Sequence, residues 1–253
     1  MLVDYHIHAL GHQGGSYNEE LLEQYCATAC SQGLAEIGFA DHDDYFEGVD
    51  EEEIRKVSKS SLRLQVKLGL EVSYWPGREK EIAKFAKAKH FDYLIGSIHH
   101  IGSWMFDHPD YISEYREWEL SDLYRTYFQL VEKLARSRLF DIVGHLDLIK
   151  VFGYRVCGNI VSFAEPALRA IKDNGLTFEV NTSGLRKPCR EMYPSRELVE
   201  RCFELGIPVT LGSDAHQSSD VGRDLAHARE LLYQVGYRKI AVFTRRQRDL
   251  VDL

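Results

Sequence analysis

Histidine and acidic residues recur along the chain in short motifs that are suited to binding metal ions. The first is Asp4-Tyr5-His6-Ile7-His8, in which two histidines stand two positions apart. On an extended segment, side chains two positions apart point to the same face, so both imidazoles can reach one ion. Further motifs follow at Asp41-His42-Asp43, Gly69-Leu70-Glu71, Ser97-Ile98-His99, Gly144-His145-Leu146-Asp147 and Gly212-Ser213-Asp214-Ala215-His216.

Nine residues form the candidate ligand set, which is more than one ion needs. They are the imidazoles of His6, His8, His12, His42, His99, His145 and His216 and the carboxylates of Glu71 and Asp214. A tetrahedral zinc takes four ligands, and six-coordinate manganese or iron takes a few more. We therefore expect two or three ions of zinc, iron or manganese, with a bridging carboxylate. Such a centre suits hydrolysis, in which a metal-bound water or hydroxide attacks, better than redox chemistry.

The segments that must position these residues read as strands alternating with amphipathic helices. This alternation predicts parallel pairing through right-handed crossovers. We predict strands at residues 2–6, 35–40, 64–72, 93–98, 141–145, 177–181 and 208–212. Seven β/α units fit this count better than the familiar eight, although residues 239–243 could form an eighth, short or peripheral strand. No linker or internal repeat divides the chain, so we expect one domain over residues 1–253.

Seven of the eleven histidines fall at or just past the carboxyl end of a predicted strand. In a β/α barrel these ends meet on one face, and active sites are built there. Histidines with purely structural roles would instead be scattered over helices and loops. Their concentration at one end of successive strands is the main sign of function in this sequence.

Capping signals predict where several helices begin and end. Helix starts are expected at Ser16, Ser121, Ser162 and Pro194-Ser195, and helix ends at Asn174-Gly175 and Gly206. Serine followed three residues later by glutamate is typical of a capping box, and Asn or Gly tolerates the left-handed backbone that ends a helix.

Composition excludes several classes of protein. The chain has 253 residues, is 44% hydrophobic and 28% charged, and carries a formal net charge of −8, which argues against a broad basic surface for nucleic acid. No membrane-spanning run or secretory signal is visible, so we expect no membrane partner. Five cysteines without a C-x-x-C pair suit a reducing cytoplasm. Cys26 and Cys30 could share a zinc, but the buried face of a helix explains them more simply.

The motifs resemble those of the polymerase and histidinol phosphatase (PHP) superfamily. The H-x-H start, D-H-D, G-L-E, S-I-H-H, G-H-L-D and G-S-D-A-H appear in family order from residue 3 to about residue 217. More narrowly, F-D-Y-L-I-G-S-I-H, F-D-H-P-D-Y and N-T-S-G-L-R-K-P resemble the histidinol-phosphate phosphatases. This resemblance implies a distorted (β/α)7 barrel with a trinuclear metal site. It also implies hydrolysis of L-histidinol phosphate to L-histidinol and phosphate in histidine biosynthesis.

The resemblance also assigns the ligands to three metal positions. It implies that His6, His8, Glu71 and Asp214 hold the first metal and that Glu71, His99 and His145 hold the second. His12, His42 and His216 would hold the third, with His12 in a glycine-bearing loop whose length varies in the family. Asp41 and Asp43 flank His42 and could orient ligand histidines through their second ring nitrogen, or could simply be loop acids.

A phosphate ester also needs cationic partners besides the metals. The planar guanidinium of arginine matches two phosphate oxygens and stays charged at any working pH. Arg155 follows the fifth predicted strand and Arg186 the sixth, and both match arginines of the family pattern. We therefore expect these two arginines to bind the phosphate group of the substrate and the inorganic phosphate that is released as a product.

Three functions remain open from sequence alone. The first is the histidinol-phosphate phosphatase that the resemblance implies. The second is a hydrolase of the same kind acting on a phosphotyrosine protein, a nucleotide or another small phosphate ester. The third is a non-catalytic metal-binding regulatory domain, against which the complete ligand set argues.

Overall fold

Seven parallel strands form a nearly closed barrel in the computed structural model, which describes residues 1–60 and 63–253. The strand order is β1-β2-β3-β4-β7-β8-β9. The strands are β1 (Val3–Ile7), β2 (Glu36–Phe39), β3 (Gln65–Ser73), β4 (Tyr93–Ser97), β7 (Ile142–Val143), β8 (Thr177–Asn181) and β9 (Val209–Gly212). The predicted fold class is confirmed, and six of the seven predicted strands are close to full length. The exception is β7, which shortens to two residues.

The barrel closes between β1 and the segment that follows β9. The His8 N–H donates to the Ala215 carbonyl over 2.8 Å, and the Ala215 N–H donates to the His6 carbonyl over 3.2 Å. The register of β1 against β2 shifts between Asp4 and Ile7. These irregularities explain why the barrel is distorted. The hydrogen bonds of Ala215 place the segment after β9 beside the first histidine motif.

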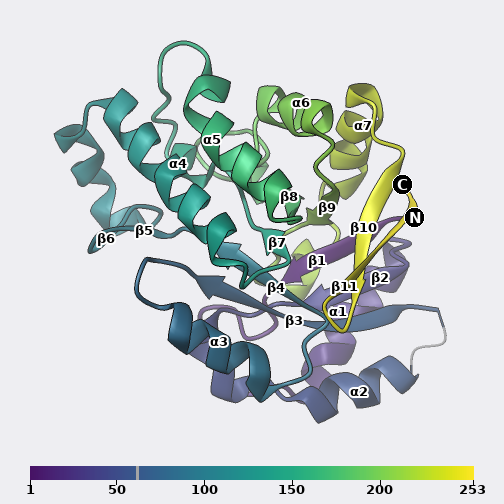
Figure 1. Ribbon diagram of the computed structural model, residues 1–253. Helices are drawn as coiled ribbons and strands as arrows, with labels where there is room; N and C mark the ends of the chain where they lie inside the picture. The colour runs from purple at the N-terminus through teal and green to yellow at the C-terminus, as the bar shows by residue number, and fades with distance from the viewer. Residues whose placement is uncertain (61–62) are drawn as a thin grey trace.

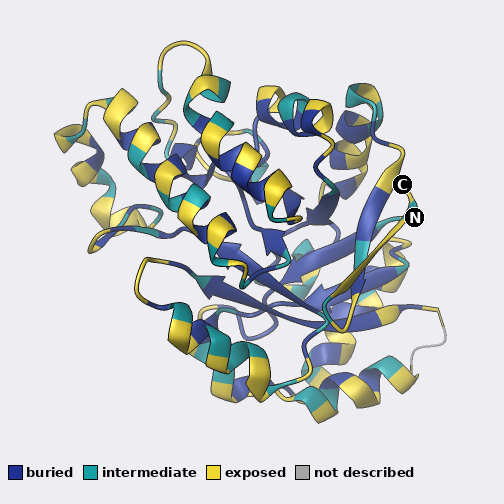
Figure 2. Cartoon of the chain, in the orientation of Figure 1, coloured by how far each residue is buried: buried dark blue, intermediate teal, exposed yellow. Residues whose placement is uncertain are grey.

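In the described part of the chain, seven α-helices surround the strands and bury their apolar faces against them. Helices α4–α7 lie along one side and α1–α3 along the other (Figure 1). Their bounds are α1 (Glu19–Ser31), α2 (Glu51–Ser60), α3 (Glu79–Ala88), α4 (Leu120–Ser137), α5 (Ile160–Asp173), α6 (Arg196–Leu205) and α7 (Leu225–Val235). Figure 2 shows buried strands inside a shell of helices whose outer faces are exposed. None of the helices in residues 1–60 and 63–253 is long and apolar enough to cross a membrane.

Shorter elements lie in the connections. Two-stranded hairpins are formed by β5 (His100–Ile101) with β6 (Trp104–Met105) and by β10 (Lys239–Thr244) with β11 (Gln247–Asp252). The 3₁₀ helices are η1 (Asp43–Gly48), η2 (Pro109–Glu117), η3 (Leu148–Lys150), η4 (Ser183–Arg186) and η5 (Ser218–Asp220).

The β10–β11 hairpin packs beside the amino-terminal half of the barrel. The Phe243 N–H donates to the Tyr5 hydroxyl over 3.1 Å, and the rings of Tyr5, Tyr93 and Phe243 lie within 4.8–6.1 Å of one another. Residues 239–243 therefore form a peripheral strand, one of the two forms considered from the sequence. On the barrel side of this contact, a Cβ at Gly69 would lie 2.4 Å from the Tyr93 ring, so strand β3 needs glycine there.

The helix ends were partly mispredicted. The N-cap of α1 is Asn18, whose side chain accepts the Leu21 N–H over 2.9 Å, and the N-cap of α5 is Asn159. The predicted starts at Ser16 and Ser162 are wrong. Asparagine caps as well as serine, and Asn18 lies between Ser16 and α1, whereas Asn159 starts α5 early enough that Ser162 lies inside the helix. Helix α4 begins one residue earlier than expected, at Leu120. The start of α6 after Ser195 and its left-handed end at Gly206 are as predicted.

Candidate metal centre

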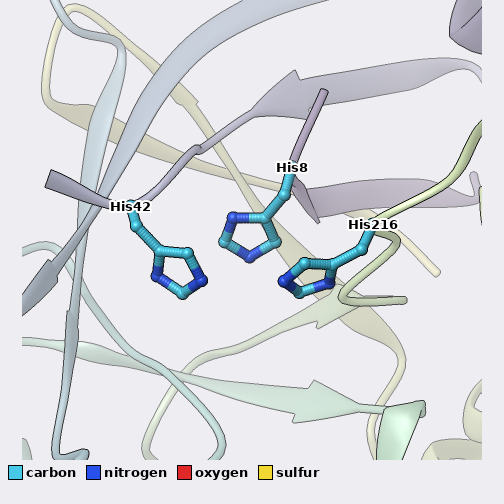
Figure 3. Close-up of side chains that lie close together, drawn as sticks. All are labelled: His8, His42 and His216. Carbon is cyan, nitrogen blue, oxygen red and sulfur yellow. The ribbon is translucent and has the colours of Figure 1, made fainter. Parts of the chain in front are cut away.

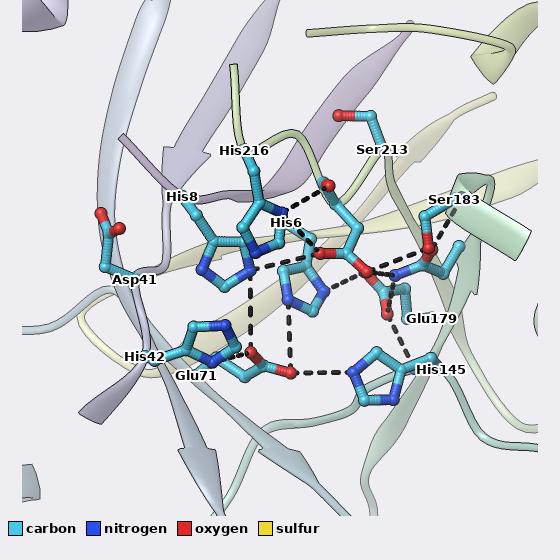
Figure 4. Close-up of polar contacts among 12 residues, drawn as sticks. His6, His8, Asp41, His42, Glu71, His145, Glu179, Ser183, Ser213 and His216 are labelled. Carbon is cyan, nitrogen blue, oxygen red and sulfur yellow. Dashed lines mark hydrogen bonds and ion pairs between the residues drawn. The ribbon is translucent and has the colours of Figure 1, made fainter. Parts of the chain in front are cut away.

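The candidate ligands come together at the carboxyl ends of the barrel strands, as expected. Figure 4 shows six of them, which are His6, His8, His42, Glu71, His145 and His216. His6 lies on β1 and Glu71 on β3, and the others follow strand ends. Two separate features fix Asp214 and His216 after β9. Asp4, buried in β1, accepts the Ser213 N–H over 2.9 Å, and Ala215 pairs with β1 as described above. Together these contacts hold Asp214 in a left-handed backbone conformation, with φ of 56°.

Glu71 is the centre of this arrangement and is almost wholly buried. Its two carboxylate oxygens face five imidazoles that come from the ends of four strands, with His6 and His8 both from β1. The nitrogen-to-oxygen distances are 2.7 Å for His42, 2.9 Å for His145, 3.4 Å for His6, 3.5 Å for His99 and 3.6 Å for His8. A carboxylate surrounded in this way can bridge neighbouring cations.

The candidate ligands form three groups, and within each group the ligand atoms all lie within 4.8 Å of one another. The groups are His6, His8 and Glu71; Glu71, His99 and His145; and His8, His42 and His216. The last three side chains point toward a common centre in Figure 3. The groups share Glu71 and His8, so they are adjacent. Asp214 borders two of them, with its Oδ1 3.3 Å from His8 Nε2 and 3.6 Å from His216 Nδ1.

His12 lies beside the third group without belonging to it. Its exposed ring is centred 4.3 Å from the His216 ring and 5.8 Å from the His42 ring. In the structure, His8 is the residue grouped with His42 and His216, whereas the resemblance implied His12. The role of His12 as a ligand therefore stays a prediction.

Unpaired nitrogens show that the centre suits metal ions. His6 Nε2, His8 Nε2 and His216 Nε2 are buried and make no hydrogen bond in the described part of the chain, although carboxylate oxygens lie 3.4 Å from the first and 3.3 Å from the second. Each such group costs about 1–3 kcal/mol when left unpaired. Imidazole nitrogen and carboxylate oxygen are suitable ligands for zinc, iron and manganese, and a bound ion would satisfy these nitrogens. The histidine and glutamate groups can therefore hold metal ions.

Protonation in the metal-free protein is strongly perturbed. Burial opposes the charged form of His99, but Glu71 and Asp107 raise the pKa of its imidazole to about 9. Burial would raise the pKa of the Glu71 carboxyl, but His6, His42 and His99 hold it well below its usual range. Burial and the neighbouring His42 and His216 hold the pKa of His8 well below its ordinary value. The metal-free centre thus carries protons on some of its ligands.

Zinc binding should therefore release protons. With a pKa of about 9, His99 is protonated at pH 7 in the metal-free protein, whereas a ligand must be neutral. Below pH 9 the apparent zinc affinity should rise with pH, by about tenfold per pH unit for each proton released. Competition with a chromophoric chelator at pH 6.5, 7.5 and 8.5 measures this. A zinc affinity that does not change over this range would contradict the assignment of His99 as a ligand.

Sequence reasoning missed the groups that contact the ligand histidines from outside. Glu179 on β8 is buried and lies 2.7 Å from His6 Nδ1. The Ser73 hydroxyl lies 2.8 Å from His99 Nδ1. The sequence did hold a sign of this role. Glu179 lies within a strand predicted to be buried, and glutamate is almost never fully buried without a partner.

The two acids that flank His42, Asp41 and Asp43, accept hydrogen bonds from backbone N–H groups rather than from imidazoles. Asp41 accepts hydrogen bonds from the N–H groups of Ala9 and Leu10, at 3.1 and 2.9 Å, and from the Tyr17 hydroxyl at 2.6 Å. Asp43 accepts from the Ser73 N–H at 3.0 Å and pairs with Arg78. The hypothesis that they orient ligand histidines is not supported. Asp41 instead fixes the loop that carries His12.

The two predicted phosphate-binding arginines lie in different surroundings. Arg186 is mostly buried, and its Nη2 donates to the Ser213 carbonyl over 2.7 Å, next to Asp214. Arg155 is exposed, and its guanidinium pairs with Glu191 at 2.6 Å and donates to the Cys189 carbonyl at 3.0 Å. Arg186 is therefore held directly against the loop of a candidate ligand, whereas Arg155 is held by the loop that follows η4.

Fold and site together define the class: a parallel β/α barrel with a histidine–carboxylate centre at the carboxyl ends of its strands. Within this class, the chain belongs to the PHP domain family, whose match covers residues 4–183. The resemblance seen in the sequence motifs is confirmed.

Relatives cover nearly the whole chain. A probable histidinol-phosphatase from Deinococcus radiodurans is 40% identical over 94% of this chain and 95% of its own. A histidinol-phosphatase from Lactococcus lactis is 27% identical over 96% and 94%. The crystal structure of histidinol phosphate phosphatase from Lactococcus lactis, complexed with zinc, L-histidinol and phosphate, has a TM-score of 0.81 over 98% of both chains at 23% identity. This last similarity shows the shared fold.

Proposed function

We propose that this protein is a metal-dependent phosphomonoesterase that hydrolyses L-histidinol phosphate to L-histidinol and phosphate in histidine biosynthesis. The observation that carries the proposal is 40% identity to a probable histidinol-phosphatase over almost the full length of both chains. The histidine–carboxylate groups around Glu71 supply the centre that such chemistry requires. All five cysteines are free, which supports a cytoplasmic location.

We propose two or three bound ions of zinc, iron or manganese. Support comes from the three adjacent ligand groups and from the zinc in the Lactococcus lactis structure. Bound ions would activate a water molecule and polarise the phosphate. The nine ligands are assigned as predicted, including His12, and the chain acts as one barrel domain over residues 1–253. Asp214 and His216 lie beyond the family match and flank Ala215, which pairs with β1 where the barrel closes.

The chain's own side chains have separate roles in this reaction. The buried carboxylate of Glu71 and the buried imidazoles of His6, His8, His99 and His145 would hold the ions. Arg186 and Arg155 bind phosphate oxygens and stabilise the charge that develops on them. Hydrogen bonds to the backbone hold both arginines near the catalytic face before substrate binds.

Phosphate release from a panel of esters tests the function. The purified protein should hydrolyse L-histidinol phosphate in preference to phosphotyrosine, nucleotides and sugar phosphates. If the protein hydrolyses a different ester preferentially, the proposed enzyme class is right and the proposed substrate is wrong. A protein that loads metal but hydrolyses none of them would be a binding domain.

Metal removal tests the centre separately. The purified protein should contain two or three transition-metal ions, and exhaustive chelation should abolish hydrolysis, because no other described group at the site supplies comparable charge. Adding zinc or manganese back should restore it. Metal analysis and phosphate release on the same preparation measure both effects. One ion or fewer, or full activity after chelation, would refute this centre.

A further inference from the structure

Glu179 contacts the candidate ligands from outside and is absent from every ligand group. It lies on β8 and is 1% exposed. Its Oε1 lies 2.7 Å from His6 Nδ1, and its Oε2 accepts the His145 backbone N–H over 2.8 Å. The side-chain amide of Asn181 donates to the same Oε2 over 3.1 Å. Both carboxylate oxygens therefore already have partners, as Figure 4 shows.

The barrel wall is shaped around this carboxylate. A Cβ at Gly212 on β9 would lie 2.0 Å from Glu179 Oε1 and 2.6 Å from the His6 Cβ. Any larger residue at position 212 would displace either Glu179 or His6. Glycine on the neighbouring strand therefore leaves the space in which Glu179 reaches across the barrel.

Glu179 also connects two of the three ligand groups. His6 belongs to the group with His8 and Glu71, and His145 belongs to the group with Glu71 and His99. Glu71 joins the same two groups from inside, through contacts of 3.4 Å to His6 Nε2 and 2.9 Å to His145 Nε2. The His6 imidazole is thus held between Glu71 on the metal side and Glu179 on the opposite side, and Glu179 also holds the backbone of His145.

We infer that Glu179 is a positioning residue of the metal centre; this rests on the proposed centre but not on the identity of the substrate. Glu179 accepts the Nδ1–H of His6, which leaves the lone pair of Nε2 directed at Glu71 and the metal position. Through the His145 backbone N–H, the same carboxylate fixes the segment after the two-residue strand β7. A strand this short provides few ladder hydrogen bonds of its own.

Glu179→Gln tests this role with almost no change in side-chain shape. Glutamine replaces one acceptor oxygen by an NH₂ group, so either His6 or the His145 N–H loses its acceptor. Zinc affinity, measured by competition with a chromophoric chelator, should fall about 10–100-fold, the usual cost of removing such an outer partner. Glu179→Asp keeps the charge but is one methylene shorter, so it should give a smaller loss and serves if the glutamine variant does not fold.

Glu36→Gln is the matched control. Glu36 is a buried glutamate at the start of β2, is 3% exposed, and contacts the Tyr5 hydroxyl and Lys67 Nζ away from the ligand groups. This variant should bind zinc as the unmodified protein does, even if it is less stable. Equal losses of zinc affinity in both variants would mean that any buried glutamate matters, and would overturn the inference.

A tautomer measurement separates positioning from stability. In zinc-loaded protein labelled with ¹⁵N-histidine, the Nδ1 of His6, assigned through a His6→Gln variant, should carry a hydrogen-bonded proton that Glu179→Gln shifts and Glu36→Gln leaves unchanged. If the unmodified protein binds no zinc, the proposed centre is wrong. If it binds zinc and Glu179→Gln binds it equally well with an unchanged His6 signal, only the role of Glu179 is wrong.

Discussion

Replacing Glu71 by alanine should abolish hydrolysis and remove at least one metal ion per chain. Glu71 faces five imidazoles and belongs to two of the three ligand groups. Without its carboxylate, two neighbouring cations would repel each other with no shared anion between them. The rate should therefore fall by more than the roughly 10²–10³ that losing one charge-stabilising group costs. Phosphate release and metal content on the same preparation measure both effects.

This experiment needs a control that distinguishes loss of the metal from loss of the folded structure. Glu36→Ala removes a buried glutamate from the neighbouring strand β2 and should leave the metal content unchanged. Thermal unfolding of the metal-free proteins then shows whether either variant is simply unfolded. A folded Glu71→Ala protein with its full metal content and normal turnover would show that Glu71 is not a bridging ligand.

Arg186→Ala should lower the rate by about 10²–10³, the scale for losing one preorganised charge-stabilising donor. A phosphate dianion spreads its charge over several oxygens, and the metals alone cannot reach all of them. Arg186 is mostly buried and is fixed to the Ser213 carbonyl beside Asp214, so its guanidinium is already held in place. Arg155→Ala should act in the same direction. Metal content should not change, because neither arginine is a ligand.

Lysine replacements and a surface control refine the arginine experiment. Arg186→Lys should restore part of the rate, because lysine keeps the charge but loses the two-pronged geometry. Arg201→Ala, which removes an arginine paired with Glu165 on the outer helices, should leave turnover unchanged. If both Arg155→Ala and Arg186→Ala hydrolyse histidinol phosphate normally with metals intact, the phosphate binds elsewhere.

The barrel and the position of its site could be predicted because the relevant rules are local or topological. Alternating strands and helices specify a parallel barrel, and the carboxyl ends of parallel strands must meet on one face. His6, Glu71 and His145 could therefore be assigned to one centre before any distance was known. Helix starts were less predictable, since Asn18 and Asn159 competed with nearby serines for the same capping role.

Only the tertiary structure decided how the ligands are grouped and what supports them. The contact between His6 and Glu179 joins residues 173 positions apart, and no local pattern specifies it. The inclusion of His8 rather than His12 in the third group likewise depends on how the loop fixed by Asp41 lies above β1. Sequence alone determined which residues reach the catalytic face, because strand period and strand direction are encoded locally. Which atoms approach within bonding distance depends on barrel closure and side-chain packing, because these bring together segments that are distant in the chain.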